Sequence, residues 1–138
     1  RYSKQPMDMC APVPSQYLVL EVLRRGLFGK VKAKAIESYR VKRDLMLSAL
    51  DKYLPELKHT RPVAGMFILL WLPEKLDSFK FADMLLDKYD VAVIPAAPFF
   101  VDGSGRNVIR LNFSMAKPEL IEEGVRRIAS LVEELSSK

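Results

Sequence analysis

The chain has 138 residues, of which 49% are hydrophobic and 28% charged, and its net charge is +5. These values are close to those of ordinary folded domains, so they exclude a disordered, collagen-like or coiled-coil chain and fit one domain. A single cysteine, Cys10, excludes an internal disulfide, and the longest apolar run, residues 66–72, is too short to cross a bilayer. We therefore expect a cytoplasmic protein without a membrane span.

Residues 1–15 contain Pro6, Pro12 and Pro14 and show no helical or strand periodicity. We expect an extended N-terminal arm over 1–15, followed by one domain over 16–138. The first residue is Arg1 and not methionine, which favours the interpretation that the chain was cut from a longer protein.

Two helices are predicted next. Apolar positions over 14–27 indicate a short helix with Ser15 as its cap, ended by Gly26 and Gly29. A longer helix over 30–53 carries one apolar stripe and stops before Pro55. The stripe consists of Ile36, Tyr39, Met46, Leu50 and Tyr53.

The positive charge is concentrated in these helices. Residues 24–43 hold eight basic side chains against one acidic side chain, Glu37, which gives +7 there and −2 in the rest of the chain. Few aromatic residues are interspersed among them, so a solvated face or a surface for another domain is favoured over nucleic-acid binding.

The remaining elements alternate between strands and helices. Strands are predicted over 65–72, 91–94 and 107–114, with a loop over 96–106 that turns at Asp102. One helix covers 78–89 with Ser78 as its cap, and a last helix begins at Pro118. The inward residues of these two helices are expected to be Ala82, Leu85, Leu86, Tyr89, Ile121, Val125, Ile128, Val132 and Leu135.

This order, α-α-β-α-β-β-α, predicts an α+β fold: a small, mostly antiparallel sheet of about three strands with helices packed on one face. In the strand over 107–114, Ile109, Leu111 and Phe113 point one way and Val108, Arg110 and Asn112 the other.

Candidates for chemistry are few. Metal-ligand spacing is absent, and His59 and Cys10 stand alone without the partners that a catalytic group needs. Arg110 is different, because a strand holds its guanidinium rigidly and the paired N–H donors match a carboxylate. The pattern alone nevertheless favours an arginine on the solvated face of the sheet. Phe99 and Phe100, just before this strand, are either an apolar wall beside Arg110 or core residues.

Five motifs occur in order along the chain: Tyr39-x-x-Lys-Arg-Asp, Pro62-Val-Ala-Gly-Met-Phe, Val91-Ala-Val-Ile-Pro, Asp102-Gly-Ser-Gly and Arg110-Leu-Asn-Phe-Ser. Together they resemble the C-terminal small domain of class I, fold type I aminotransferases that use pyridoxal 5'-phosphate. The similarity is greatest to the 2-aminoadipate/kynurenine aminotransferase branch, including the related domain of MocR-type regulators.

The resemblance implies a domain of a larger enzyme that transfers an amino group between an amino acid and a 2-oxo acid. Arg110 matches the arginine that binds the substrate α-carboxylate, and Phe99 matches a residue lining the substrate pocket. The resemblance also implies a missing large domain and a homodimeric intact enzyme. From the residues themselves, a membrane partner is not expected and nucleic-acid binding is disfavoured.

The lysine that carries the cofactor lies in an S-x-[ST]-K stretch followed by Pro-Gly-x-Arg in this family. This chain has no such stretch, and Lys4, which follows Ser3, lacks the Pro-Gly-x-Arg context. We therefore expect no catalytic residue, no cofactor-binding residue and no activity in the 138-residue chain alone. A stand-alone or regulator-attached module that binds a small carboxylate without catalysis is the alternative.

Overall fold

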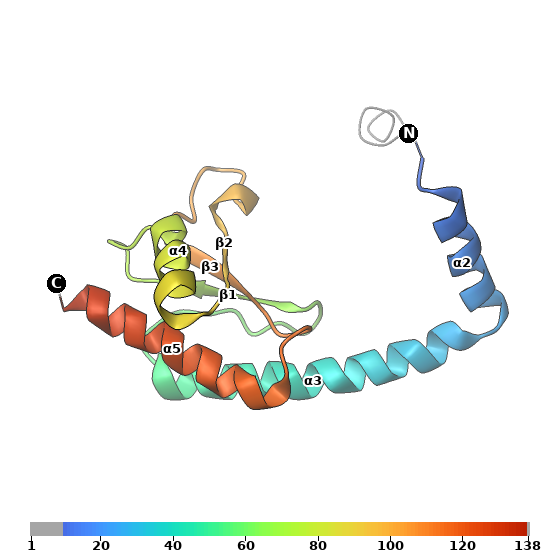
Figure 1. Ribbon diagram of the computed structural model, residues 1–138, viewed down its shortest axis with the longest axis horizontal. Helices are drawn as coiled ribbons and strands as arrows, with labels where there is room; N and C mark the ends of the chain where they lie inside the picture. The colour runs from blue at the N-terminus through green and yellow to red at the C-terminus, as the bar shows by residue number, and fades with distance from the viewer. Residues whose placement is uncertain (1–9, 138) are drawn as a thin grey trace. The chain divides into compact units, whose positions relative to one another are not determined.

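The computed structural model describes residues 10–137, and Figure 1 labels its helices and strands. The chain divides into two units, Arg1–Ser38 and Tyr39–Lys138. Lys4 and most of the expected N-terminal arm lie outside the described residues. The elements are α2 (Val13–Arg24), α3 (Leu27–Tyr53), β1 (Phe67–Trp71), α4 (Ser78–Tyr89), β2 (Ile94–Pro95), η1 (Ala97–Phe99), β3 (Val108–Asn112) and α5 (Pro118–Ser136). None of the described helices is both long and apolar enough to cross a membrane.

The first unit contains α2 and the start of α3. Helix α2 begins at Val13, so the last three residues of the segment expected to be extended, 13–15, are helical, and Pro12 occupies the N-cap position without a side-chain cap. Ser15 is therefore not the cap. Gly26 separates the helices with a φ of +64°, as expected of a glycine after a helix, whereas Gly29 lies inside α3.

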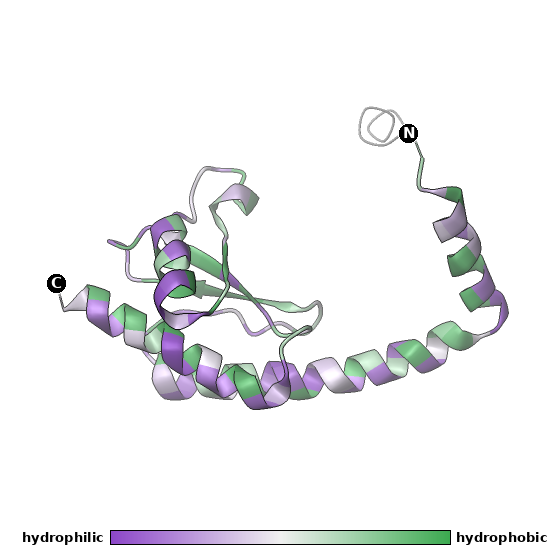
Figure 2. Ribbon diagram, in the orientation of Figure 1, coloured by the Kyte–Doolittle hydropathy of each residue, from purple (hydrophilic) through white to green (hydrophobic). Residues whose placement is uncertain are grey.

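No residue of α2 is buried, although Figure 2 shows many hydrophobic residues along it. An amphipathic helix normally buries its apolar stripe against a neighbour. The exposed large apolar side chains of α2 are Val13, Tyr17, Leu18, Val19, Leu20 and Leu23.

The second unit is built on a three-stranded sheet of order β1-β3-β2, in which both pairings are antiparallel. The predicted α+β class with a small antiparallel sheet is therefore confirmed. The register sets Leu69 opposite Arg110 on one side and Ile94 opposite Arg110 on the other.

The hydrophobic core lies on one face of this sheet. Side chains alternate along a strand, so Ile68 and Leu70 of β1 share a face with Ile109 and Leu111 of β3. The same buried cluster includes side chains of α3, α4 and α5: Met46, Ala49, Leu50, Phe81, Leu85, Ile121, Val125, Ile128, Ala129, Leu131 and Val132. Burial of Ile121, Val125, Ile128 and Val132 confirms the predicted stripe of α5.

Helix α4 departs from expectation at two points. Its N-cap is Asp77, whose Oδ1 accepts hydrogen bonds from the backbone N–H groups of Phe79 and Lys80 at 3.0 and 3.2 Å. Ser78, the expected cap, is the first helical residue and is fully buried. Leu86 was expected to face inward but is 51% exposed, because the helix turns Phe81 and Leu85 to the core.

Candidate functional site

Arg110 lies on β3, the central strand of the sheet. Strand β3 is hydrogen-bonded to β1 on one side and to β2 on the other. Because successive residues of a strand point to opposite faces of the sheet, the Arg110 side chain projects from the face opposite to that of Ile109 and Leu111. The backbone that carries Arg110 is therefore fixed by two strand pairings, and its side chain is half-buried on the face away from the core.

Two aromatic rings contact the guanidinium of Arg110. Its Cζ lies 4.2 Å from the ring centroid of Phe67 and 4.5 Å from that of Phe99. Phe67 comes from β1 and Phe99 from η1, so two elements more than 25 residues apart in sequence converge on one cation. The negative face of an aromatic ring attracts a guanidinium, so both contacts are favourable.

No acidic residue of the described chain neutralises this cation. Five other arginines of the described chain pair with carboxylates: Arg25, Arg43, Arg61, Arg126 and Arg127. Within residues 10–137 Arg110 has no such ion pair, and its Nε is buried without a hydrogen-bond partner. A permanent cation with unused donors beside apolar rings is suited to a planar anion such as a carboxylate.

Arg110 and Phe99 were predicted from the sequence, and the structure brings the two together. Phe67, whose ring is nearer to the Arg110 Cζ than that of Phe99, was not predicted. The signal was present in the alternation of 67–71, because an antiparallel register with Leu69 opposite Arg110 places Phe67 on the same face, one diagonal step away.

The other candidate groups have structural partners or lie apart from Arg110. His59 Nδ1 lies 3.2 Å from the Leu57 carbonyl oxygen and Nε2 lies 3.4 Å from Asp51 Oδ1. Asp102 Oδ1 accepts hydrogen bonds from the N–H and Oγ–H of Ser104, which lower the pKa of Asp102. This side chain closes the predicted turn. No group of three His, Cys, Asp or Glu side chains suited to a metal occurs in the described residues.

The basic stretch also finds local partners. Arg43 Nε donates to the neighbouring Asp44 and its Nη1 lies 3.4 Å from the Pro62 carbonyl oxygen. Lys42 Nζ donates to the carbonyl oxygen of Ser114 at 2.8 Å, which ties α3 to the segment after β3. These two cations therefore stabilise the fold of the second unit.

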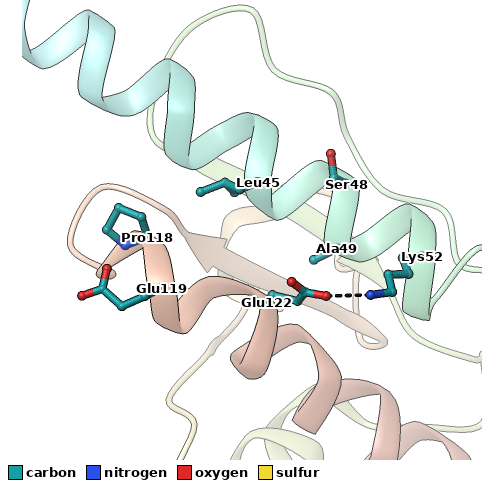
Figure 3. Close-up of a pocket in the computed structure, with 7 residues that line it drawn as sticks. All are labelled: Leu45, Ser48, Ala49, Lys52, Pro118, Glu119 and Glu122. Carbon is teal, nitrogen blue, oxygen red and sulfur yellow. Dashed lines mark hydrogen bonds and ion pairs between the residues drawn. The ribbon is translucent and has the colours of Figure 1, made fainter.

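A groove of about 550 Å³ lies between α3 and α5 (Figure 3). Lys52 Nζ donates to Glu122 Oε1 at 2.8 Å, and the Tyr53 hydroxyl donates to the same oxygen at 2.9 Å. The bonds from Lys52 and then Tyr53 lower the pKa of Glu122, and the pKa of Lys52 is raised in return. Lys52, the cation of this groove, is therefore paired with a carboxylate, unlike Arg110.

Comparisons with known proteins identify the family of the chain. Residues 3–128 match the model of the family described as aminotransferase class I and II. An uncharacterised aminotransferase of Saccharolobus solfataricus is 40% identical over 136 residues, which cover 97% of this chain and 34% of that protein.

Two solved structures are similar over nearly the whole chain. An archaeal alanine:glyoxylate aminotransferase has a TM-score of 0.86 and 46% identity, and the match covers 96% of this chain and 33% of that one. The alpha-aminoadipate aminotransferase of Thermus thermophilus, complexed with N-(5'-phosphopyridoxyl)-L-leucine, has a TM-score of 0.84 and 36% identity, with 99% and 35% covered. This chain thus spans about a third of the length of the proteins it matches, and it belongs to the class I and II aminotransferase family.

Proposed function

We propose that residues 16–138 are the small domain of a pyridoxal-phosphate-dependent aminotransferase, in which Arg110 binds the α-carboxylate of the substrate. The observation that carries this proposal is the Arg110 guanidinium, which has no acidic partner in the described chain and lies over Phe67 and Phe99. The family match supports transamination as the reaction of the intact protein, with an amino acid and a 2-oxo acid as substrates.

The chain's own contribution is binding and orientation. The planar guanidinium donates two parallel hydrogen bonds to a carboxylate, which fixes the direction of the substrate's α-carbon. Holding that carbon in one orientation lowers the entropic barrier to the step that follows. Phe99 lines the substrate pocket, and the phenyl rings reduce the access of water to the ion pair, which strengthens it.

The site fits the substrate and not the cofactor. A guanidinium with two phenyl rings provides no lysine amine and no carboxylate partner for a pyridine nitrogen. When bound, pyridoxal phosphate supplies the electron sink for amino-group transfer. We infer that its lysine and the groups that hold it belong to a large domain of the intact protein, which is a homodimer, so the 138-residue chain alone is inactive.

The exposed apolar face of α2 supports a large-domain partner. Six large apolar side chains of this helix are exposed in the chain as described, and none is buried. Contiguous exposed apolar surface of this kind marks an interaction site in soluble proteins.

Titration of the chain with 2-oxoglutarate, followed by NMR, tests the assignment of Arg110. The variant Arg110→Ala should weaken binding by at least about tenfold, as loss of a bidentate charged contact predicts. Arg106→Ala is the matched control, because Arg106 precedes the same strand. Equal affinities of the Arg110→Ala variant and the unchanged chain would contradict the proposal. Turnover of an amino acid by this chain with added pyridoxal phosphate would contradict its inactivity.

A module that binds a carboxylate without catalysis is the second candidate. It is favoured by the same observation, since the groups at Arg110 bind an anion and include none for chemistry. The two candidates differ in the intact protein: a transaminase converts 2-oxoglutarate and an amino acid, whereas a regulatory module binds them unchanged.

A further inference from the structure

Arg110 and the substrate carboxylate do not by themselves fix the plane of the guanidinium. An arginine side chain has several rotatable bonds, and no hydrogen bond or ion pair holds Arg110 in the described residues. Its guanidinium instead contacts the two rings of Phe67 and Phe99. The orientation of the donor pair therefore depends on these rings.

The two rings differ in how firmly they are held. Phe67 lies on β1, opposite Asn112 in the ladder with β3, and is 37% exposed. Phe99 lies at the end of the short helix η1 and is 59% exposed. Phe67 also has the shorter distance to Cζ of Arg110, 4.2 Å against 4.5 Å.

We propose that Phe67 is a positioning residue for carboxylate binding: its ring holds the guanidinium of Arg110 in the plane that receives the carboxylate. This inference rests on the proposed function of Arg110 and adds a residue that acts through it. Phe99 completes the aromatic contact from the more exposed side and, in this arrangement, meets the guanidinium as well as the substrate.

Burial of the Arg110 Nε provides a signal that is independent of catalysis and of ligand. A buried N–H exchanges its hydrogen with water more slowly than an exposed one, because exchange requires the group to open to solvent. If Phe67 covers the guanidinium, removal of its ring speeds the exchange of the Arg110 Nε hydrogen. A residue that only filled space beside the strand would not change this rate when replaced by another apolar side chain.

The experiment compares Phe67→Leu, Phe67→Trp and Phe79→Leu in the 138-residue chain. Leucine keeps apolar volume without the aromatic face, and tryptophan keeps the aromatic face. Phe79 on α4 is a matched control, because it is a half-exposed phenylalanine that does not contact Arg110. NMR measures Arg110 Nε hydrogen exchange at mildly acidic pH and the Kd for 2-oxoglutarate.

Phe67→Leu is expected to speed the exchange and to raise the Kd by about threefold to thirtyfold, the range of one cation–π contact. Phe67→Trp and Phe79→Leu should stay within about twofold of the unchanged chain. An unchanged exchange rate in Phe67→Leu, or an equal change in Phe79→Leu, overturns the proposal. Failure of the unchanged chain to bind 2-oxoglutarate contradicts the proposed function instead, and the exchange rates still decide the role of Phe67.

Discussion

Substitution of Gly105 tests how closely the loop before β3 is packed. Its φ is +79°, and a Cβ at this position would lie 2.7 and 2.8 Å from Cε2 and Cγ of Phe100. Gly103 also has a positive φ, +75°, but a Cβ there would meet nothing within 4 Å. The variants Gly105→Ala and Gly103→Ala therefore share the backbone strain, and only the first adds a steric overlap.

The two contributions have different sizes. A left-handed conformation costs a non-glycine residue about 1–2 kcal/mol. Displacing a packed ring costs about a further 1–3 kcal/mol. Gly103→Ala should therefore lower the free energy of unfolding by about 1–2 kcal/mol, and Gly105→Ala by about 2–5 kcal/mol.

Urea unfolding followed by tryptophan fluorescence measures both values. Trp71 is the only tryptophan, and it pairs with Val108 in the ladder that follows this loop, so its emission reports on the relevant sheet. Linear extrapolation gives the free energy of each variant. If the free energies of unfolding of the two variants agree to within about 0.5 kcal/mol, the predicted overlap with Phe100 is refuted.

Two further predictions concern the helices. Asp77→Ala should lower the free energy of unfolding by about 1 kcal/mol, because the α4 cap is lost. Ser78→Ala should leave the free energy of unfolding unchanged, because the buried Ser78 Oγ has no hydrogen-bond partner. Equal losses of the two variants in urea unfolding would contradict this assignment. Glu123 accepts hydrogen bonds from Arg127 and, with a smaller effect, from Arg126, and both bonds lower the pKa of Glu123. The contribution of Glu123 to the free energy of unfolding is therefore present above the pKa of an unfolded glutamate and is lost as the pH falls through the folded pKa. An NMR pH titration should show the Glu123 pKa rising in Arg127→Ala, and an unchanged pKa would show that the pair does not persist in solution.

The sequence was sufficient for features that depend on local periodicity. The stripe of α5 and the alternation in β3 each repeat over several residues, and burial follows the repeat closely. Arg110 was found in this way, because its position between Ile109 and Leu111 already placed it on the opposite face. The motif resemblance added its expected role.

Features that depend on pairing between distant segments were not predicted. Phe67 contacts Arg110 only because of the register between β1 and β3, and hydrophobic periodicity fixes the face of each residue without selecting between registers that differ by two residues. The cap of α4 was misplaced by one residue, because both Asp77 and Ser78 are good capping residues and only the backbone geometry selects between them. Leu86 was assigned to the core because an apolar residue beside Leu85 fits the predicted stripe of the helix. In the structure Phe81 and Leu85 face the core, and this rotation of the helix leaves Leu86 exposed.

The central position of β3 separates the backbone position of Arg110 from the side chains that line its guanidinium. The Cα of Arg110 is held by ladders on both sides, so substitutions on the edge strand β1 or in η1 leave it in position. Those two elements carry the rings that surround the guanidinium. Substitutions on β1 or in η1 can therefore change the aromatic lining around the guanidinium while the Cα of Arg110 keeps the position that the sheet gives it.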